Sequence, residues 1–181
     1  IKDEAKDVVF ALKNNGYRVV MLTGDNELMA ETIAGRLGIT EFYANMLPDG
    51  KVEKVEEILK NKKQNDVVVY VGDGINDSPV LMRCDIGICM GGKGSDSSIE
   101  ASDIVLIRDD LKKIITAKKI AQKTNLIAKE NIIFALFTKI LVLLLSVFGI
   151  TGLYLAIFAD VGVSVLAILN SMRMLAFKEQ K

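Results

Sequence analysis

Two aspartates stand four residues apart on a glycine-rich stretch that directly follows an apolar run. Asp73 and Asp77 lie in the sequence GDGINDSP, residues 72–79, and the apolar run occupies residues 67–71. Carboxylates this close together repel each other unless a cation joins them. Mg²⁺ takes carboxylate oxygens as ligands, so this stretch predicts a magnesium site.

Other polar groups occur where the pattern changes from strand-like to helix-like. Thr23, Gly24 and Asp25 follow an apolar run, and Lys51 opens a helix-like segment in the sequence LPDGK. Taken singly, a Thr-Gly-Asp turn is most often a helix cap, and a helix lysine is most often solvated. Together with the aspartate-rich stretch, these groups offer a hydroxyl, an ammonium, carboxylates, and glycines that let backbone amides approach a ligand. The combination is typical of a phosphate site beside a hard cation.

The elements that must position these groups alternate between strand and helix patterns. Strands are predicted over residues 17–22, 42–45, 67–71 and 86–90, and helices over residues 27–37, 49–61 and 77–83. β-branched strands separated by helices indicate a parallel sheet covered on both faces, which is an α/β, doubly wound fold. Ligands of such sheets gather at the carboxyl ends of the strands, where the polar stretches are expected.

The second part of the chain is apolar. The whole chain is 25% charged, but residues 132–170 carry only Lys139 and Asp160. Residues 132–150 and 152–170 are each long enough to cross a hydrocarbon core of ~30 Å at ~1.5 Å per residue. We therefore expect a transmembrane helical hairpin whose bend lies at Thr151-Gly152.

Positive charge flanks the open end of this hairpin. Residues 111–129 are lysine-rich, and Arg173 and Lys178 follow the second span. The lysine-rich stretch is either a solvated helix face or an inner-leaflet anchor drawn to anionic headgroups. By the positive-inside rule, we expect the bend to face outward and the soluble part to be cytoplasmic. The protein is then a multi-pass protein of the cell membrane, and membrane lipid is one of its partners.

The two intramembrane charges are expected at similar depths. Counted from the bend, Lys139 and Asp160 differ in depth by ~5 Å. Each would cost at least ~2.5 kcal/mol if it faced lipid at the bilayer centre, so both should face inward. They form either a structural salt bridge or part of an ion pathway.

Composition excludes several functional classes. The chain has no histidine, which excludes imidazole catalysis and imidazole ligands. Cys84 and Cys89 fit no zinc spacing and are expected to pack in the core, at a helix end and in a strand respectively. The net charge is zero and no basic stripe is interleaved with aromatic residues, which indicates no nucleic-acid partner.

The stretches TGDN at 23–26, LPDGK at 47–51 and GDGINDSP at 72–79 resemble the phosphorylation-domain motifs of P-type ATPases, which have a haloacid dehalogenase-like fold. The resemblance implies a reaction with ATP through an aspartyl phosphate. It also implies roles for individual residues: Asp73 and Asp77 hold Mg²⁺ or its waters, Lys51 and Thr23 contact the phosphate, and Gly24, Asp25 and Asn76 complete the site.

The nucleophile motif of that family, Asp-Lys-Thr-Gly-Thr, does not occur in the sequence, which begins with Ile1. We therefore expect an incomplete sheet that lacks the nucleophile strand. The chain is interpreted as the C-terminal portion of a longer pump and as inactive alone. Its partner is then the upstream part of the same pump, which supplies the nucleophile strand, the nucleotide domain and the remaining helices.

The expected hairpin carries a second resemblance. Asn131 and Lys139, spaced as N-x7-K, and the following Asp160-Val161-Gly162 are similar to the last two helices of the heavy-metal branch that exports Zn²⁺, Cd²⁺ and Pb²⁺. The resemblance implies that Asp160 binds the transported cation, that Lys139 is its counter-ion, and that Asn131 and Gly162 belong to the same site. A carboxylate oxygen suits such divalent ions.

The expected organisation is a phosphorylation domain over residues 1–110, a basic juxtamembrane helix over 111–130, the hairpin over 131–175, and a cytoplasmic tail over 176–181. The function it indicates is part of an ATP-driven heavy-metal exporter. Two alternatives remain. One is a freestanding haloacid dehalogenase-type phosphatase, which needs its own nucleophilic aspartate. The other is a non-enzymatic membrane adaptor derived from a truncated pump.

Overall fold

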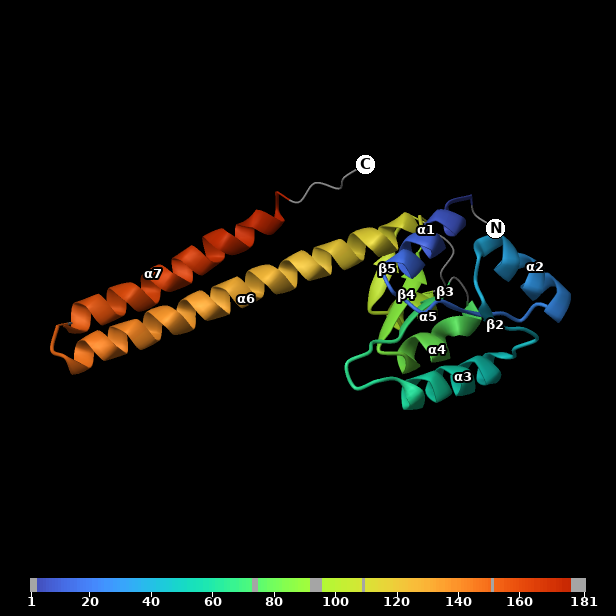
Figure 1. Cartoon of the computed structure of the whole chain (residues 1–181), viewed down its shortest axis with the longest axis horizontal. Helices are drawn as coiled ribbons and strands as arrows, with labels where there is room; N and C mark the ends of the chain where they lie inside the picture. The colour runs from blue at the N-terminus through green and yellow to red at the C-terminus, as the bar shows by residue number, and fades with distance from the viewer. Residues whose placement is uncertain (1–2, 73–74, 92–95, 109, 151, 177–181) are drawn as a thin grey trace. The chain divides into compact units, whose positions relative to one another are not determined.

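The computed structural model describes residues 3–72, 75–91, 96–108, 110–150 and 152–176 of the chain. The chain forms two compact units, Ile1–Lys113 and Ile114–Lys181 (Figure 1). The first contains α1 (Asp3–Asn14), β1 (Val20–Leu22), α2 (Glu27–Leu37), β2 (Glu41–Tyr43), α3 (Pro48–Asn61), β3 (Val69–Gly72), η1 (Ile75–Asp77), α4 (Ser78–Arg83), β4 (Ile86–Met90), α5 (Asp96–Glu100) and β5 (Ile104–Leu106). The second contains most of α6 (Lys112–Val147), all of α7 (Leu153–Ser171) and η2 (Met172–Met174).

The strand pairs that the structure describes in the first unit are parallel, as predicted. β1 pairs with β2, and β4 lies between β3 and β5 in a second sheet. Within the described residues, β1 and β3 do not pair, and the apolar side chains of Val69 and Val71 on β3 are 45% and 38% exposed. The described strands therefore form two separate sheets with a gap between β1 and β3, as expected for a fold that lacks one strand.

The core of this unit lies where α4 packs on β4. Val80 and Leu81 of α4 and Cys89 of β4 are almost completely buried. A Cβ atom added at Gly87 would lie 2.7 Å from the carbonyl oxygen of Leu81, so glycine is required for α4 to approach the strand this closely. α3 and α4 lie side by side (Figure 1). The predicted burial of both cysteines is confirmed in part, because Cys84 is only half-buried.

The strongest local signals in the sequence are those of α2, whose predicted bounds are confirmed. The side chain of Asn26 accepts a hydrogen bond from the backbone N–H of Met29, which caps the first turn. Gly38 adopts a left-handed conformation, with φ of 71°, and ends the helix.

Several strands differ from their predicted bounds. β1 begins at Val20 instead of residue 17, because the N–H of Tyr17 closes the end of α1 on the carbonyl of Leu12. β3 begins at Val69 instead of residue 67, because Val68 bonds the turn residue Asp85. β2 covers Glu41–Tyr43 instead of residues 42–45. The sequence analysis did not predict α5 or β5.

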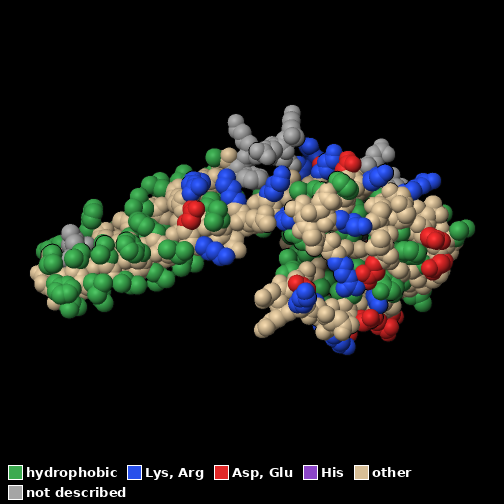
Figure 2. Space-filling view, in the orientation of Figure 1, with side chains coloured by type: hydrophobic (Ala, Val, Ile, Leu, Met, Phe, Trp, Pro, Cys, Tyr) green, Lys and Arg blue, Asp and Glu red, His purple; other side chains and the backbone are tan. Residues whose placement is uncertain are grey.

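The second unit is a hairpin of two apolar helices. α6 and α7 are both long and apolar enough to cross a membrane. Large apolar side chains are exposed along both, including Ile133, Phe137, Leu143 and Phe158 (Figure 2). The lysine-rich stretch and the first predicted span are one continuous helix, α6.

The bend begins before the predicted Thr151-Gly152. α6 ends at Val147, and Gly149 takes a left-handed conformation with φ of 71°. The N–H groups of Gly149 and Ile150 donate to the carbonyls of Ser146 and Leu145, which is a Schellman motif. Thr151 lies outside the described residues, and Gly152 is the N-cap of α7.

Candidate functional site

Lys51 and Asp77, which are far apart in the sequence, meet in the first unit. Nζ of Lys51 lies 2.9 Å from Oδ1 of Asp77, and the phenol of Tyr70 donates to the same oxygen at 3.0 Å. Asp77 is only 6% exposed. The structure therefore brings together two of the predicted site residues, and a cation and a hydroxyl compensate the buried carboxylate.

Local structure explains how Lys51 reaches this position. Pro48 occupies the first turn of α3, where its lack of an N–H costs nothing, and Leu47 is the N-cap. Lys51 lies one turn later and donates its backbone N–H to the carbonyl of Leu47 at 3.0 Å. A rigid first turn thus presents the ammonium group to Asp77.

Thr23, Gly24 and Asp25 form a tight turn after β1. The hydroxyl of Thr23 donates to Oδ2 of Asp25 at 2.9 Å and accepts from the N–H of Asp25 at 3.1 Å. The N–H groups of Met46 and Asn45 donate to the carbonyls of Thr23 and Asp25 at 3.0 and 2.7 Å. The turn is therefore fixed to the segment that leads into α3 and Lys51.

The remaining residues of the predicted phosphate and magnesium site lie around η1. Asn76 is exposed in η1, next to Asp77. Asp73 lies outside the described residues. Within the described ones, no three Cys, Asp or Glu side chains come close enough to hold a metal ion. Asp77 is thus the predicted magnesium ligand whose surroundings the structure defines.

Three titratable side chains near the strands, Arg18, Glu41 and Cys84, make contacts within the fold. The guanidinium of Arg18, hydrogen-bonded to Glu41, lowers the pKa of that carboxyl and joins the β1 and β2 ends. Burial raises the pKa of the Cys84 thiol, which donates to the carbonyl of Leu81 at 3.0 Å. A protonated thiol is a poor metal ligand, which agrees with a packing role.

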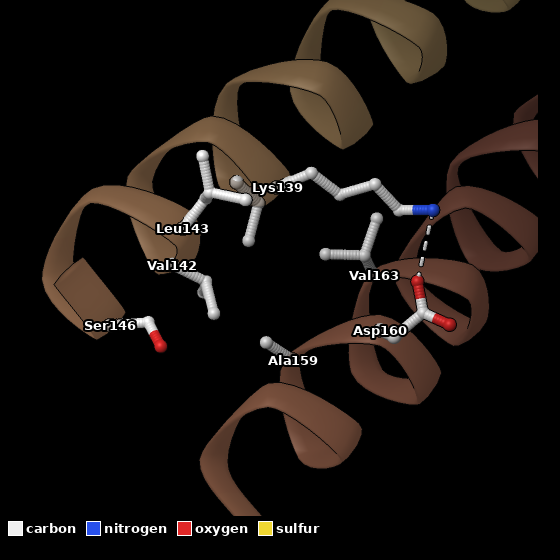
Figure 3. Close-up of a pocket in the computed structure, with 8 residues that line it drawn as sticks. Lys139, Val142, Leu143, Ser146, Ala159, Asp160 and Val163 are labelled. Carbon is white, nitrogen blue, oxygen red and sulfur yellow. Dashed lines mark ion pairs between the residues drawn. The ribbon is translucent and has the colours of Figure 1, made fainter. Parts of the chain in front are cut away.

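Lys139 and Asp160 form an ion pair between the two helices of the hairpin, with Nζ 3.1 Å from Oδ1 (Figure 3). The pair borders a groove of about 240 Å³. Side chains from both helices line the rest of it: Thr138, Val142, Leu143, Ser146, Ala159 and Val163. The two charges are thus close together, as predicted, and they lie beside a mainly apolar groove.

Asn131 lies about 12 Å along α6 from Lys139, at ~1.5 Å per residue. Its side-chain N–H group donates to the carbonyl of Ala167 and the hydroxyl of Ser171 at 3.2 and 3.0 Å, and its oxygen accepts from Asn170 at 2.8 Å. The sequence analysis missed Asn170, although an amide within an apolar helix is a signal for such a bond.

Glu130 lies at the open end of the hairpin, and Gly162 lies in the middle of α7. Glu130 accepts from Arg173 at 3.0 Å, which adds an ion pair next to the asparagines. At Gly162, an added Cβ would find no atom within 4 Å. The structure therefore joins Asn131 to α7, about two turns from Lys139, and leaves open space beside Gly162.

The fold and the site define the class of the protein as a haloacid dehalogenase-like domain followed by a hairpin of membrane-type helices. The family described as haloacid dehalogenase-like hydrolase matches residues 1–85. Phosphoserine phosphatase, at 23% identity and a TM-score of 0.53 over 61% of this chain and 64% of that chain, shares the fold of the first unit.

Relatives identify the chain more closely. It is 45% identical, over 99% of its length, to the cadmium, zinc and cobalt-transporting ATPase of Bacillus subtilis, and 44% identical, over 96%, to a zinc-transporting ATPase of Synechocystis. A solved zinc-transporting PIB-type ATPase in its E2.Pi state matches 97% of the chain at 37% identity with a TM-score of 0.89. The chain is a homologue of the cadmium- and zinc-transporting P-type ATPases, as its motifs predicted. It spans 26%, 24% and 28% of these three proteins respectively.

Proposed function

We propose that the chain is the C-terminal part of an ATP-driven exporter of Zn²⁺, Cd²⁺ or Pb²⁺ that works through an aspartyl phosphate. The observation that carries the proposal is the meeting of Lys51 and Asp77 at 2.9 Å, at the carboxyl end of β3, in a chain that matches metal-transporting ATPases over 99% of its length. Strand ends of this kind bind phosphate and metal ions in doubly wound sheets.

Residue chemistry supports separate roles in the phosphate site. Carboxylate oxygens are suitable Mg²⁺ ligands, which fits Asp77 and the neighbouring Asp73, and Mg²⁺ supplies positive charge to the phosphate when it is bound. The ammonium of Lys51 and the hydroxyl of Thr23 are suitable phosphate donors. Asp25 orients the Thr23 hydroxyl through the 2.9 Å hydrogen bond.

The break between the two sheets supports a nucleophile supplied from upstream. In the described residues, β1 and β3 do not pair with each other, and β3 exposes Val69 and Val71. A further parallel strand between them would satisfy both edges and would end beside Lys51 and Asp77. We infer that this strand carries the aspartate that receives the phosphoryl group, and that the chain alone is inactive.

The hairpin supplies the transport part of the proposal. Asp160 binds the exported cation, and Lys139 neutralises the carboxylate when the cation has left. Positive charge at the open end of the hairpin favours a cytoplasmic position for the first unit and an outward-facing bend. Asn131 and Gly162 are included because they share the sequence pattern of the heavy-metal branch.

Phosphorylation experiments on two proteins test this function. The longer protein that contains this chain should incorporate ³²P from ATP when Zn²⁺ or Cd²⁺ is present, in a form that hydroxylamine removes. The 181-residue chain alone should incorporate none. Covalent ³²P in the isolated chain would instead point to a freestanding phosphatase with its own nucleophile. A longer protein without metal-dependent ³²P incorporation would favour the adaptor function.

A further inference from the structure

Asp77 accepts two hydrogen bonds on one oxygen from two different elements. Lys51 of α3 approaches Oδ1 to 2.9 Å, and the phenol of Tyr70 on β3 approaches the same atom to 3.0 Å. The Lys51 and Asp77 side chains are only 17% and 9% exposed. Because water has little access to this carboxylate, its stability depends on the donors that the protein provides.

Gly72, at the end of β3, leaves room for the contact between Tyr70 and Asp77. A Cβ atom at Gly72 would lie 3.0 Å from Cβ and Oδ2 of Asp77 and 3.1 Å from Cε1 of Tyr70. Any side chain at this position would therefore displace the tyrosine ring or the carboxylate. The contact between Tyr70 and Asp77 therefore depends on glycine at position 72.

We propose that Tyr70 is a positioning residue that holds Asp77 in place when Lys51 moves from this carboxylate to the phosphate. This inference rests on the proposed function, in which Lys51 contacts the phosphoryl group. The ammonium group has three N–H donors, and its bond to Oδ1 weakens when it turns toward a phosphate. A second, uncharged donor on Oδ1 lets Lys51 leave without stripping the buried carboxylate of all its hydrogen bonds.

Loss of the phenolic hydroxyl should therefore act on phosphate binding. In Tyr70→Phe, Lys51 is the one described hydrogen-bond donor left to Asp77, so moving Lys51 to a phosphate leaves Oδ1 without a donor, whether or not Mg²⁺ is bound. Removing a hydrogen bond to a charged group changes an equilibrium by about tenfold or more. The ring remains, so the packing against Gly72 is kept. Nucleotide binding elsewhere in the longer protein should not change.

The experiment compares the longer protein with its Tyr70→Phe and Tyr43→Phe variants at a fixed, saturating Mg²⁺ concentration. Tyr43 is the matched control, because its phenol also donates to a strand carboxylate, but to Glu41, at 3.2 Å, instead of Asp77. Orthovanadate serves as the phosphate probe. Its affinity is measured from protection against trypsin and from inhibition of ATP hydrolysis. Tyr70→Phe should weaken vanadate binding about tenfold and leave KM for ATP within twofold, and Tyr43→Phe should change neither.

The outcomes separate this inference from the function on which it rests. A wild-type protein that neither binds vanadate nor hydrolyses ATP with metal would refute the proposed function and this inference with it. A functional wild type with an unchanged Tyr70→Phe variant would refute the role of Tyr70 alone. Equal losses in vanadate affinity, ATP affinity and thermal stability would show a purely structural role and would also overturn the inference.

Discussion

Lys139 and Asp160 lie 3.1 Å apart between Nζ and Oδ1, yet 65% and 64% of their side chains are exposed in the hairpin. Large apolar side chains such as Leu143 and Ile157 are exposed on the same two helices. Charged groups in contact with lipid are costly, even when they are paired. We therefore expect other helices to shield the pair from lipid. The chain spans 26% of its Bacillus subtilis relative, which leaves room for such helices in a longer protein.

Substitution of Asp160 should reduce metal binding by the longer protein. Asp160→Asn replaces a charged oxygen donor with a neutral one, so the Zn²⁺ or Cd²⁺ bound per protein after desalting should fall to less than half. Lys139→Ala should leave binding nearly intact and slow turnover, because the empty carboxylate loses its counter-ion and holds the metal longer. Metal stoichiometry and metal-dependent ATP hydrolysis measure the two effects.

Two further variants serve as controls for the ion pair. Thr138→Val changes a groove residue whose hydroxyl donates to the carbonyl of Phe134 in its own helix, and it should alter neither measurement. The double variant Lys139→Met with Asp160→Leu removes both charges. If transport returns in the double variant, the pair is a structural bridge and Asp160 is not a metal ligand.

Removal of Lys51 should destabilise the first unit. Lys51→Met leaves the buried carboxylate of Asp77 with Tyr70 as a neutral donor, at a cost of about 2–3 kcal/mol. Near-UV circular dichroism of the tyrosines, followed during heating of the chain in detergent, reports the change. Adding Asp77→Asn should restore most of the stability, because no buried charge remains. Lys54→Met removes a surface ion pair with Glu57 and the contact of the ammonium with the Tyr43 ring, and it should destabilise the unit much less than Lys51→Met does.

The sequence predicted the parts of this structure that depend on neighbouring residues. The bounds of α2 were predicted, because helix ends are set by local capping, here at Asn26 and Gly38. Lys51 and Asp77 were assigned to one site because parallel strands place their carboxyl ends together. The alternation of strands and helices predicted the doubly wound parallel fold, and the resemblance of the motifs to those of P-type ATPases implied that this fold is haloacid dehalogenase-like.

Other features could not be predicted because they depend on contacts between distant residues. β5 has only 3 residues, too few to show a period, and it exists because Ile104–Leu106 pairs with β4. The hydrogen bond from Tyr70 to Asp77 joins two elements whose side-chain directions a sequence does not show. The amide pair of Asn131 and Asn170 spans 39 residues across the hairpin.

Alanine at Gly72 should disrupt the proposed phosphate site. Its Cβ would lie 3.0 Å from Asp77 and 3.1 Å from Tyr70, so one of these side chains must shift. We expect Gly72→Ala to lower the free energy of unfolding by about 1–3 kcal/mol and to abolish metal-dependent ³²P incorporation in the longer protein. Gly50→Ala is the control, because its Cβ would meet only the flexible end of Met46, at 3.7 Å. It should retain phosphorylation.

Asp85 should make the stability of the first unit depend on pH. Hydrogen bonds from Lys62 and from the backbone N–H of Val68 lower the pKa of this carboxyl, and they hold the turn that precedes β4 to the start of β3. A carboxyl whose pKa is lower in the folded state stabilises the fold above its unfolded pKa of about 3.9. This contribution is lost as the pH falls through the lower, folded-state pKa.

Asp85→Asn should therefore lower the free energy of unfolding by about 1 kcal/mol at pH 7, where the carboxylate is charged in both states. The difference from wild type should shrink as the pH drops below about 4 and should vanish once the carboxyl is protonated in the folded chain as well. Thermal midpoints between pH 3 and 7, from the tyrosine near-UV signal, provide the measurement. Asp66→Asn is the matched control, because the hydrogen bond that Asp66 accepts within the described part of the chain comes from the backbone N–H of Lys63 in its own turn, at 3.3 Å. A loss for Asp85→Asn that stays constant across this pH range would mean that the side chain acts through its shape and neutral hydrogen bonds, and the electrostatic account would be wrong.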